Sequence, residues 1–163
     1  MIVRDIPWWT PEAVVFVDKL LNKKMRILEF GSGASTAWLC ARAGHVVSVE
    51  HSRRWYDFID KSKYKNLDLR LMDRPYDRIC DEFEIDYFDF VMVDGRDRVK
   101  CFIRAKRVLK PGGWIGLDDS TRGRYEEAVQ SVSDWFSYKT NNPNPKEMQT
   151  GSCHTQFWRK PSQ

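Results

Sequence analysis

The chain has 163 residues, of which 42% are hydrophobic and 31% charged, and its formal net charge is +4 at pH 7. This composition excludes a disordered or fibrous chain, and the length predicts one domain over residues 1–163. No apolar run reaches the roughly 18 residues that span a bilayer, and the start lacks the apolar core of a signal peptide. We therefore expect no membrane partner and a cytoplasmic location. The small positive excess does not by itself predict nucleic-acid binding.

Helical and strand-like patterns alternate along the chain. The first predicted helix covers residues 10–21, because Thr10 supplies a capping hydroxyl and Pro11 suits the first helical position. A helix over 34–43 is expected to end at Gly44 in a left-handed conformation, and the Lys-Pro-Gly-Gly run at 110–113 to stop the chain sharply. The other predicted helices are 52–60, 99–109 and 125–136, and the predicted strands are 25–30, 45–50, 67–72, 88–93, 114–117 and 155–159.

The order of these elements predicts the fold class. Five strands that alternate with helices need crossover connections, which favour a mainly parallel sheet with helices on both faces. Such crossovers are almost always right-handed, so we expect a doubly wound α/β domain. Strand 67–72 is the least apolar and is expected at a sheet edge, and the C-terminal strand is expected to run antiparallel.

A glycine loop follows the first predicted strand. Gly31 and Gly33 precede a helix, so their backbone can approach a ligand closely and offer amide donors. Glu50 ends the next strand, 21 residues after Glu29, where a carboxylate can accept from both hydroxyls of a ribose. Thr36 stands where the dinucleotide fingerprint has its third glycine, which counts against NAD. Glu29 suits a positively charged part of a ligand better than a pyrophosphate.

Four segments carry motifs in a fixed order: 27–36 (ILEFGSGAST), 47–50 (VSVE), 88–95 (FDFVMVDG) and 109–119 (LKPGGWIGLDD). Together they resemble the small class I S-adenosylmethionine (SAM)-dependent methyltransferases, whose fold is Rossmann-like. The resemblance implies SAM as cofactor, with its methionine part at the glycine loop, its ribose at Glu50 and its adenine edge near Asp73. The cofactor-binding residues that it implies are Glu29, Gly31, Gly33, Ser35, Thr36, Glu50, His51, Asp73 and Asp94.

Acidic residues end the fourth and fifth predicted strands. In the O-methyltransferases that resemble catechol-methylating enzymes, the positions of Asp94, Asp118 and Asp119 hold a divalent metal, which implies Mg²⁺ here, with Asp94 and Asp118 catalytic. Alternatively, Asp119 caps the following segment and only the other two face the pocket. The chain departs from those enzymes at Asp97, where they have a catalytic lysine, so the general base stays open.

The expected function is transfer of a methyl group to a small-molecule acceptor, most simply at a hydroxyl oxygen. Alternatives are a methyltransferase of RNA or protein, a nucleotide-binding oxidoreductase, and a SAM-binding subunit that supports a partner.

Residues 1–24 are expected to form an arm and helix that cover the acceptor pocket, or else to fix the helix to the core through Trp8 and Trp9. His154 is a candidate base, and a homo-oligomer is a further expectation. Most basic residues from Arg96 to Arg107 are expected on a solvated helix face, with a smaller role for Arg96 and Arg98 at an anionic acceptor.

Overall fold

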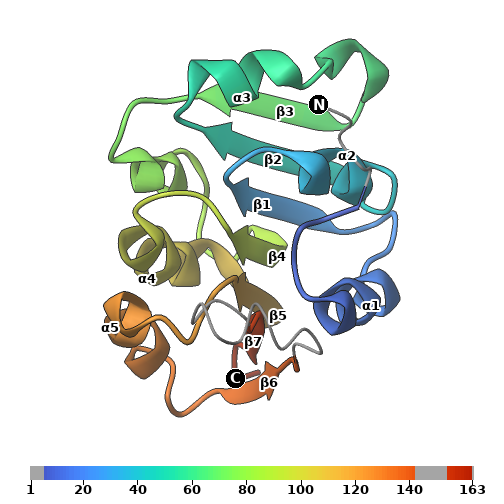
Figure 1. The fold of residues 1–163 in the computed structure, drawn as a ribbon. Coiled ribbons are helices and arrows are strands. Elements are labelled where there is room, and N and C mark those ends of the chain that lie inside the picture. The colour runs from blue at the N-terminus through green and yellow to red at the C-terminus, as the bar shows by residue number, and fades with distance from the viewer. Residues whose placement is uncertain (1–5, 142–153, 163) are drawn as a thin grey trace.

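The computed structural model describes residues 6–141 and 154–162, and it contains a seven-stranded sheet with the strand order β3-β2-β1-β4-β5-β7-β6 (Figure 1). The first five strands pair in parallel, whereas β7 is antiparallel to both of its neighbours, as predicted for the C-terminal strand. The weakly apolar strand β3 lies at one edge, also as predicted. The strands are β1 (Arg26–Phe30), β2 (His45–Glu50), β3 (Leu67–Leu71), β4 (Phe88–Val93), β5 (Leu109–Leu117), β6 (Phe136–Lys139) and β7 (Gln156–Arg159).

Helices cover both faces of this sheet. Figure 1 shows α1 and α2 on one side and α4 and α5 on the other. The helices are α1 (Pro11–Leu20), α2 (Ala34–Cys40), α3 (Arg53–Phe58), α4 (Arg98–Val108) and α5 (Glu126–Gln130), and the 3₁₀ segments are η1 (Lys61–Lys63), η2 (Tyr76–Glu82) and η3 (Gly123–Tyr125). None of the helices in the described residues has the length and apolar character needed to cross a membrane.

A hydrophobic cluster lies on each face of the sheet. Successive strand residues point to opposite faces, so Ile27 joins the cluster under α1 and α2, whereas Leu28 joins the cluster under η2, α4 and α5. Both side chains are fully buried. A parallel sheet covered on both faces requires strands that are apolar throughout, which explains the nearly continuous apolar runs of β1 and β4.

The position of β1 fixes where a ligand can bind. The chain leaves β1 toward β2 on one side, whereas β4 pairs with β1 on the other side, so the strand order reverses between β1 and β4. In open sheets of this kind, ligands bind beside the carboxyl ends of the strands at such a switch point. The loops after Phe30 and Val93 meet there, since the Asp94 amide donates to the Phe30 carbonyl over 3.0 Å.

The N-terminal end of α1 is built as the sequence predicts. The Thr10 hydroxyl accepts from the Ala13 amide over 3.3 Å, and Pro11 occupies the first turn. Because the same hydroxyl lies 2.7 Å from that of Thr140, this cap also ties α1 to the segment that follows β6.

The predicted end of the helix over 34–43 is wrong. Helix α2 ends at Cys40, and the positive-φ glycines of the described residues are Gly31 and Gly112, so Gly44 is not left-handed. A side chain at Gly44 would instead clash with the carbonyl group of Lys23. The glycine is therefore required by close approach of two backbones and not by a helix cap.

The C-terminal third differs most from the predictions. The helix predicted over 125–136 ends at Gln130, and exposed Phe136 begins the unpredicted strand β6. The Pro-Gly-Gly run does not break the chain, because it is part of β5, with Gly112 at a φ of 76°. Strand β6 pairs with β7, and Gly112 and Gly113 exchange backbone hydrogen bonds with Lys160, the residue after β7. Local sequence pattern shows neither contact. The sequence over 139–152 is polar and rich in asparagine and proline, which predicts a loop, and most of this segment lies outside the described residues.

Candidate active site

A cavity of about 350 Å³ lies at the carboxyl ends of β1, β2 and β4. Its volume is within the usual range for small-ligand sites. The glycine loop, the end of β2, the loop after β4 and the segment after β5 form its wall, together with two tryptophans. The lining residues include Trp8, Gly31, Ser32, Gly33, Ala34, Ser35, Glu50, His51, Trp55, Asp94, Gly95, Arg96, Arg98, Arg122, Arg124 and Tyr125.

The glycine loop brings the ends of β1 and β4 into contact. Gly31 has a φ of 95°, and a Cβ atom built on it would lie 2.6 Å from the Cα atom of Gly95. Only glycine adopts this conformation readily and leaves this space. The Gly33 amide donates to the Thr36 hydroxyl over 2.9 Å, which holds the start of α2 against the loop.

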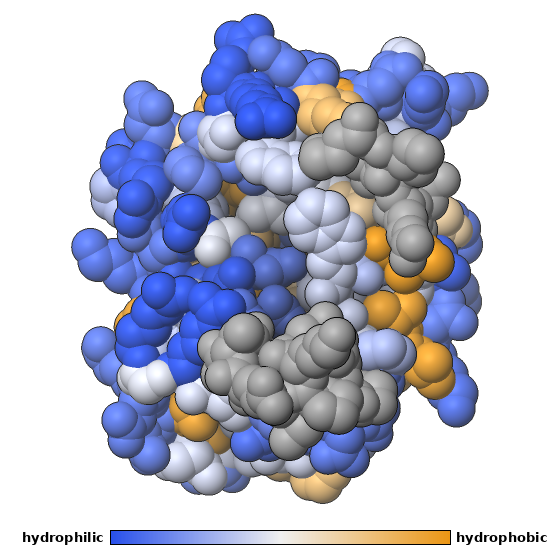
Figure 2. All heavy atoms as spheres, viewed as in Figure 1, coloured by the Kyte–Doolittle hydropathy of each residue, from blue (hydrophilic) through white to orange (hydrophobic). Residues whose placement is uncertain are grey.

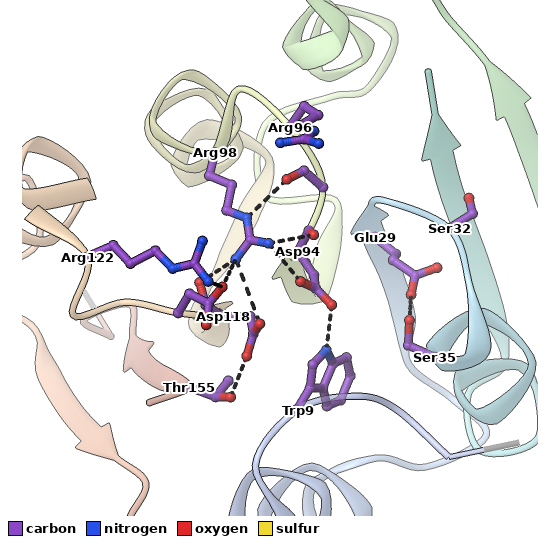
Figure 3. Close-up of polar contacts among 12 residues, drawn as sticks. Trp9, Glu29, Ser32, Ser35, Asp94, Arg96, Arg98, Asp118, Arg122 and Thr155 are labelled. Atoms are coloured by element: carbon purple, nitrogen blue, oxygen red, sulfur yellow. Dashed lines mark hydrogen bonds and ion pairs between the residues drawn. The ribbon is translucent and has the colours of Figure 1, made fainter. Parts of the chain in front are cut away.

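Glu29 lies behind this loop and is not among the residues that line the cavity. Its carboxylate accepts hydrogen bonds from the hydroxyls of Ser35 (2.5 Å), Thr36 (2.7 Å) and Ser48 (2.5 Å). Figure 3 shows Glu29 directed at Ser35, away from the acidic residues of the site. Complete burial raises the pKa of Glu29, although the three hydroxyl groups act in the opposite direction. The carboxylate therefore fixes the first turn of α2 from inside the fold.

Glu50 lines the cavity with its carboxylate already oriented. It accepts from the backbone amides of Ser32 (2.9 Å), His51 (2.9 Å) and Ser52 (2.7 Å), and it is only 4% exposed. The imidazole ring of His51, which also lines the cavity, stacks on Tyr76 with ring centroids 5.8 Å apart. Asp73, in contrast, is exposed and is not among the lining residues.

Arg98 lies among the three aspartates that we expected to hold a metal. Its guanidinium group donates to the Asp94 side chain over 3.0 Å and to the Asp118 carbonyl over 2.6 Å. It lies 3.7 Å from the carboxylate of Asp118 and 3.8 Å from that of Asp119. Figure 3 shows this side chain reaching from the start of α4 between Asp94 and Asp118.

The Mg²⁺ prediction is not supported by this arrangement. The guanidinium group occupies the space between the carboxylates and supplies the positive charge that we expected from a metal. Asp119 is drawn away by Arg122, over 2.8 Å, and one Asp118 oxygen accepts from the Thr155 hydroxyl, also over 2.8 Å. Across residues 6–141 and 154–162, no three His, Cys, Asp or Glu side chains are arranged to hold a metal ion. The residues present do not fit the metal site.

Burial and neighbouring charges act on two of these aspartates. Burial and the neighbouring charge of Asp118 raise the pKa of Asp94 well above its ordinary value, although Arg98 opposes this shift. Burial and the charge of Asp119 likewise raise the pKa of Asp118. Of the three, only Asp94 lines the cavity, so Asp118 and Asp119 act on the site through Arg98.

The two N-terminal tryptophans have different environments. Trp9 is buried, packs against Trp38 with ring centroids 6.1 Å apart, and donates its indole N–H to Asp94 over 3.2 Å. Trp8 is 67% exposed, lines the cavity and contacts Trp55 edge-on. Trp9 thus fixes α1 to the core, and Trp8 forms part of the cavity wall.

The candidate base His154 is not among the lining residues, and its Nδ1 atom lies 2.6 Å from the Thr140 carbonyl oxygen.

Sequence reasoning missed several cavity residues. Trp55, Arg122, Arg124 and Tyr125 come from segments with no motif, and their place in the wall depends on tertiary structure. Arg98 pairs with Asp94, four residues earlier, but Asp94 precedes α4, so the helical rule for pairs at this spacing does not apply. We assigned most of the basic run to a solvated surface and kept a smaller role for Arg96 and Arg98 at an anionic acceptor; the Arg98 side chain is only 11% exposed.

Comparison with known proteins independently supports the methyltransferase family and the fold. A family model described as a methyltransferase domain matches residues 28–120. The fold is similar to a tRNA (m1A58) methyltransferase from Aquifex aeolicus, with a TM-score of 0.70 and 18% identity over 98% of this chain and 72% of that one. It is also similar to a SAM-dependent O-methyltransferase from Thermotoga maritima, with a TM-score of 0.66 and 18% identity over 94% of this chain and 66% of that one.

A third similar structure is an rRNA methylase from Streptococcus thermophilus, with a TM-score of 0.67 and 12% identity over 91% of this chain and 93% of that one. No curated protein matches the sequence. At such low identity these structures show the fold, and their different acceptors do not identify an acceptor for this chain. The family model, in contrast, covers more than half of the residues. The chain therefore belongs to this methyltransferase family and is a class I SAM-dependent methyltransferase.

Proposed function

We propose that the enzyme methylates a hydroxyl oxygen of a small-molecule acceptor. The observation that supports this most directly is a single cavity that has the glycine loop and Glu50 on one side and the Asp94 carboxylate on another. The proposed cofactor site and an ionisable group therefore face the same cavity. When bound, SAM supplies a methyl carbon that the acceptor oxygen attacks in line, as the carbon–sulfur bond breaks and S-adenosylhomocysteine forms.

The residues around the cavity fit SAM. One Glu50 oxygen accepts from the amides of His51 and Ser52 and lies 3.0 Å from the His51 ring nitrogen. The other oxygen accepts from the Ser32 amide and retains capacity for a ribose hydroxyl. Gly31 and Gly33 expose backbone next to this carboxylate, and Ser35 and His51 complete this part of the wall. Glu29 and Thr36 are proposed to act indirectly, by holding the glycine loop and α2 in place.

Asp94 is the proposed acceptor of the hydroxyl proton. One of its oxygens is held by Trp9 and the other by Arg98, so the carboxylate has a fixed orientation at the cavity wall. An oriented carboxylate can accept a proton from a bound hydroxyl as the oxygen attacks. Asp118 is proposed to position Arg98, not to contact the acceptor, and the arm with Trp8 is proposed to cover the acceptor side.

The alternatives differ in the acceptor or in the chemistry. The family match favours a methyltransferase over a nucleotide-binding oxidoreductase. We prefer a small molecule to an RNA or protein acceptor because Asp94 lines a cavity of about 350 Å³, a volume that suits a small ligand. A homo-oligomer and a cytoplasmic location remain predictions.

Replacement of Glu50 tests the proposed cofactor site. We expect Glu50→Ala to weaken SAM binding by more than about tenfold, because a hydrogen-bonded carboxylate that faces the cavity is lost. Calorimetric titration measures the affinity. Glu84→Ala is the matched control, since Glu84 is exposed and not a lining residue of this cavity. Unchanged affinity in Glu50→Ala would contradict the proposed ribose site.

Methyl-labelled SAM tests the acceptor class. The protein is incubated with label and, separately, with phenolic hydroxyl compounds, with amines and with total RNA. We expect label on a hydroxyl compound and its loss in Asp94→Asn. Label transferred to RNA or to an amine, with none on a hydroxyl, would contradict the proposal.

A further inference from the structure

Arginine side chains form one wall of the cavity, opposite in charge to Glu50 and Asp94. Arg96, Arg98, Arg122 and Arg124 all line it. Two of them form ion pairs with carboxylates. Arg98 pairs with Asp94, Asp118 and Asp119, and Arg122 pairs with Asp119. Figure 3 shows Arg96 apart from this ion-paired group, next to the loop that follows β4.

Arg96 and Arg124 have a different environment. Neither guanidinium group makes an ion pair or a hydrogen bond with another described residue, and both side chains are exposed. Arg124 lies beside the ring of Tyr125, with its guanidinium carbon 5.0 Å from the ring centroid. The backbone of Arg96 is fixed, because the buried Tyr76 hydroxyl donates to its carbonyl over 2.7 Å. An anchored residue thus presents an uncompensated charge to the cavity.

A second hollow adjoins this wall. It has a volume of about 320 Å³ and shares Gly95, Arg96, Arg98, Arg124 and Tyr125 with the first cavity. Its further lining includes the basic residues Arg74 and Lys100. The carboxylate of Asp97 also lines it, and Arg74 already pairs with that carboxylate. Figure 2 shows hydrophilic residues predominating on the half of this face that carries α4. The second hollow therefore has a clear excess of positive charge.

We infer that the acceptor carries an anionic group, a carboxylate or a phosphate, which binds in the second hollow between Arg96 and Arg124. This inference rests on the proposed function, because it assigns the acceptor of that same site. Guanidinium groups bind such anions through paired N–H donors, and a concave wall of one sign concentrates the field on a small ligand. Gly95, which is common to both cavities, connects this anion site with the end of β4, where Asp94 lies.

The shape of the charged surface favours a small anion over RNA. Nucleic-acid binding needs basic residues spread along a stripe that follows many phosphates. Here the unmatched guanidinium groups of Arg96 and Arg124 line the same two adjoining hollows, which suits one or two anionic groups. An anionic hydroxy acid or a phosphorylated alcohol has this chemistry.

Inorganic phosphate is the probe for the anion site. It is titrated by calorimetry into the protein saturated with S-adenosylhomocysteine and, separately, into the free protein. We expect one phosphate per chain, with affinity lowered roughly tenfold in Arg96→Gln and in Arg124→Gln, because each loses charged hydrogen bonds. Arg78→Gln is the control, since Arg78 is also exposed but is not among the residues that line either cavity. Benzoate should displace the phosphate, and neutral benzyl alcohol should not.

The outcomes separate this inference from the proposed function. Failure of S-adenosylhomocysteine to bind would contradict the cofactor site, while the titration of the free protein would still report on the anion site. Equal phosphate affinity in the wild type and both variants, or an equal loss in Arg78→Gln, would overturn the anion site. Binding of a single-stranded oligoribonucleotide that excludes phosphate would also overturn it, because the hollow would then be an RNA surface. Thermal midpoints near that of the wild type confirm that the variants are folded.

Discussion

At the scale of single residues, Arg98 supplies the positive charge that pairs with the carboxylates of the candidate active site. Three carboxylates that converge would repel one another unless a cation lies among them. The sequence alone leaves the identity of that cation open, and the family resemblance implied Mg²⁺ as one possibility. In the structure the cation is a side chain from the start of α4, which also donates to the Gly95 carbonyl over 3.0 Å. The site is therefore built without need of a metal to neutralise Asp94.

Arg98→Gln tests this assignment. We expect the free energy of unfolding to fall by about 3 kcal/mol, because removing one partner of a buried ion pair leaves charges uncompensated. The variant should also gain stabilisation by Mg²⁺, since the carboxylates lose their resident cation, whereas wild-type unfolding should not respond to Mg²⁺ or EDTA. Denaturant unfolding with and without each additive measures both effects.

The control for this experiment is Arg53→Gln, because Arg53 also pairs with an aspartate, Asp57, but on the exposed surface of α3. Such pairs contribute little, so its stability should change by less than about 1 kcal/mol. Stabilisation of the wild-type protein by Mg²⁺ would argue that a metal can displace Arg98 and would restore the metal hypothesis.

At the scale of elements, Gly31 after β1 and Gly95 after β4 are in close contact, and both line the cavity. Gly31→Ala should destabilise the protein by about 2 kcal/mol or more, because a positive φ costs alanine about 1–2 kcal/mol and its Cβ would meet Gly95. SAM affinity should fall as well, since the loop must move. Denaturant unfolding and calorimetry measure these quantities.

Gly123→Ala is the matched control, because a Cβ atom on Gly123 has nothing within 4 Å. We expect a change of less than about 0.5 kcal/mol, as at most surface sites. Equal destabilisation by both substitutions would show that the contact between the two loops has no special role.

At the scale of the whole molecule, β7 joins parts of the chain that are far apart in sequence. The ring of Phe157 is fully buried and lies 4.8 Å from that of Phe16 in α1 and 6.3 Å from that of Phe90 in β4, measured between centroids. Phe157→Ala should lower the free energy of unfolding by about 3–5 kcal/mol through a core cavity. One transition should remain, with SAM affinity little changed in the folded protein, as unfolding and calorimetry will show.

Phe136→Ala on the neighbouring strand β6 is the control, because that side chain is 69% exposed. It should change stability by less than about 1 kcal/mol. Two separate transitions in Phe157→Ala would indicate that the C-terminal strands unfold independently of the parallel sheet.

The sequence alone determined the parallel part of the fold and the methyltransferase family. Strand 88–93 and strand 45–50 were predicted with their observed limits, because buried strands are apolar throughout and end at turn residues. Sequence spacing was enough to select the glycine loop and Glu50 as candidate cofactor-binding residues, because they lie at the ends of two adjacent strands. Both line the same cavity.

Only the tertiary structure decided what surrounds those motifs. Strand β6 forms by pairing with β7, and Phe136 followed a helical pattern that this pairing overrides. Arg98, Arg122 and Arg124 reach the cavity because α4 and the segment after β5 fold over the ends of the strands. Local sequence records which residues prefer a helix or a strand, but charge pairing and the lining of a cavity depend on distances between segments that the chain brings together only when it folds.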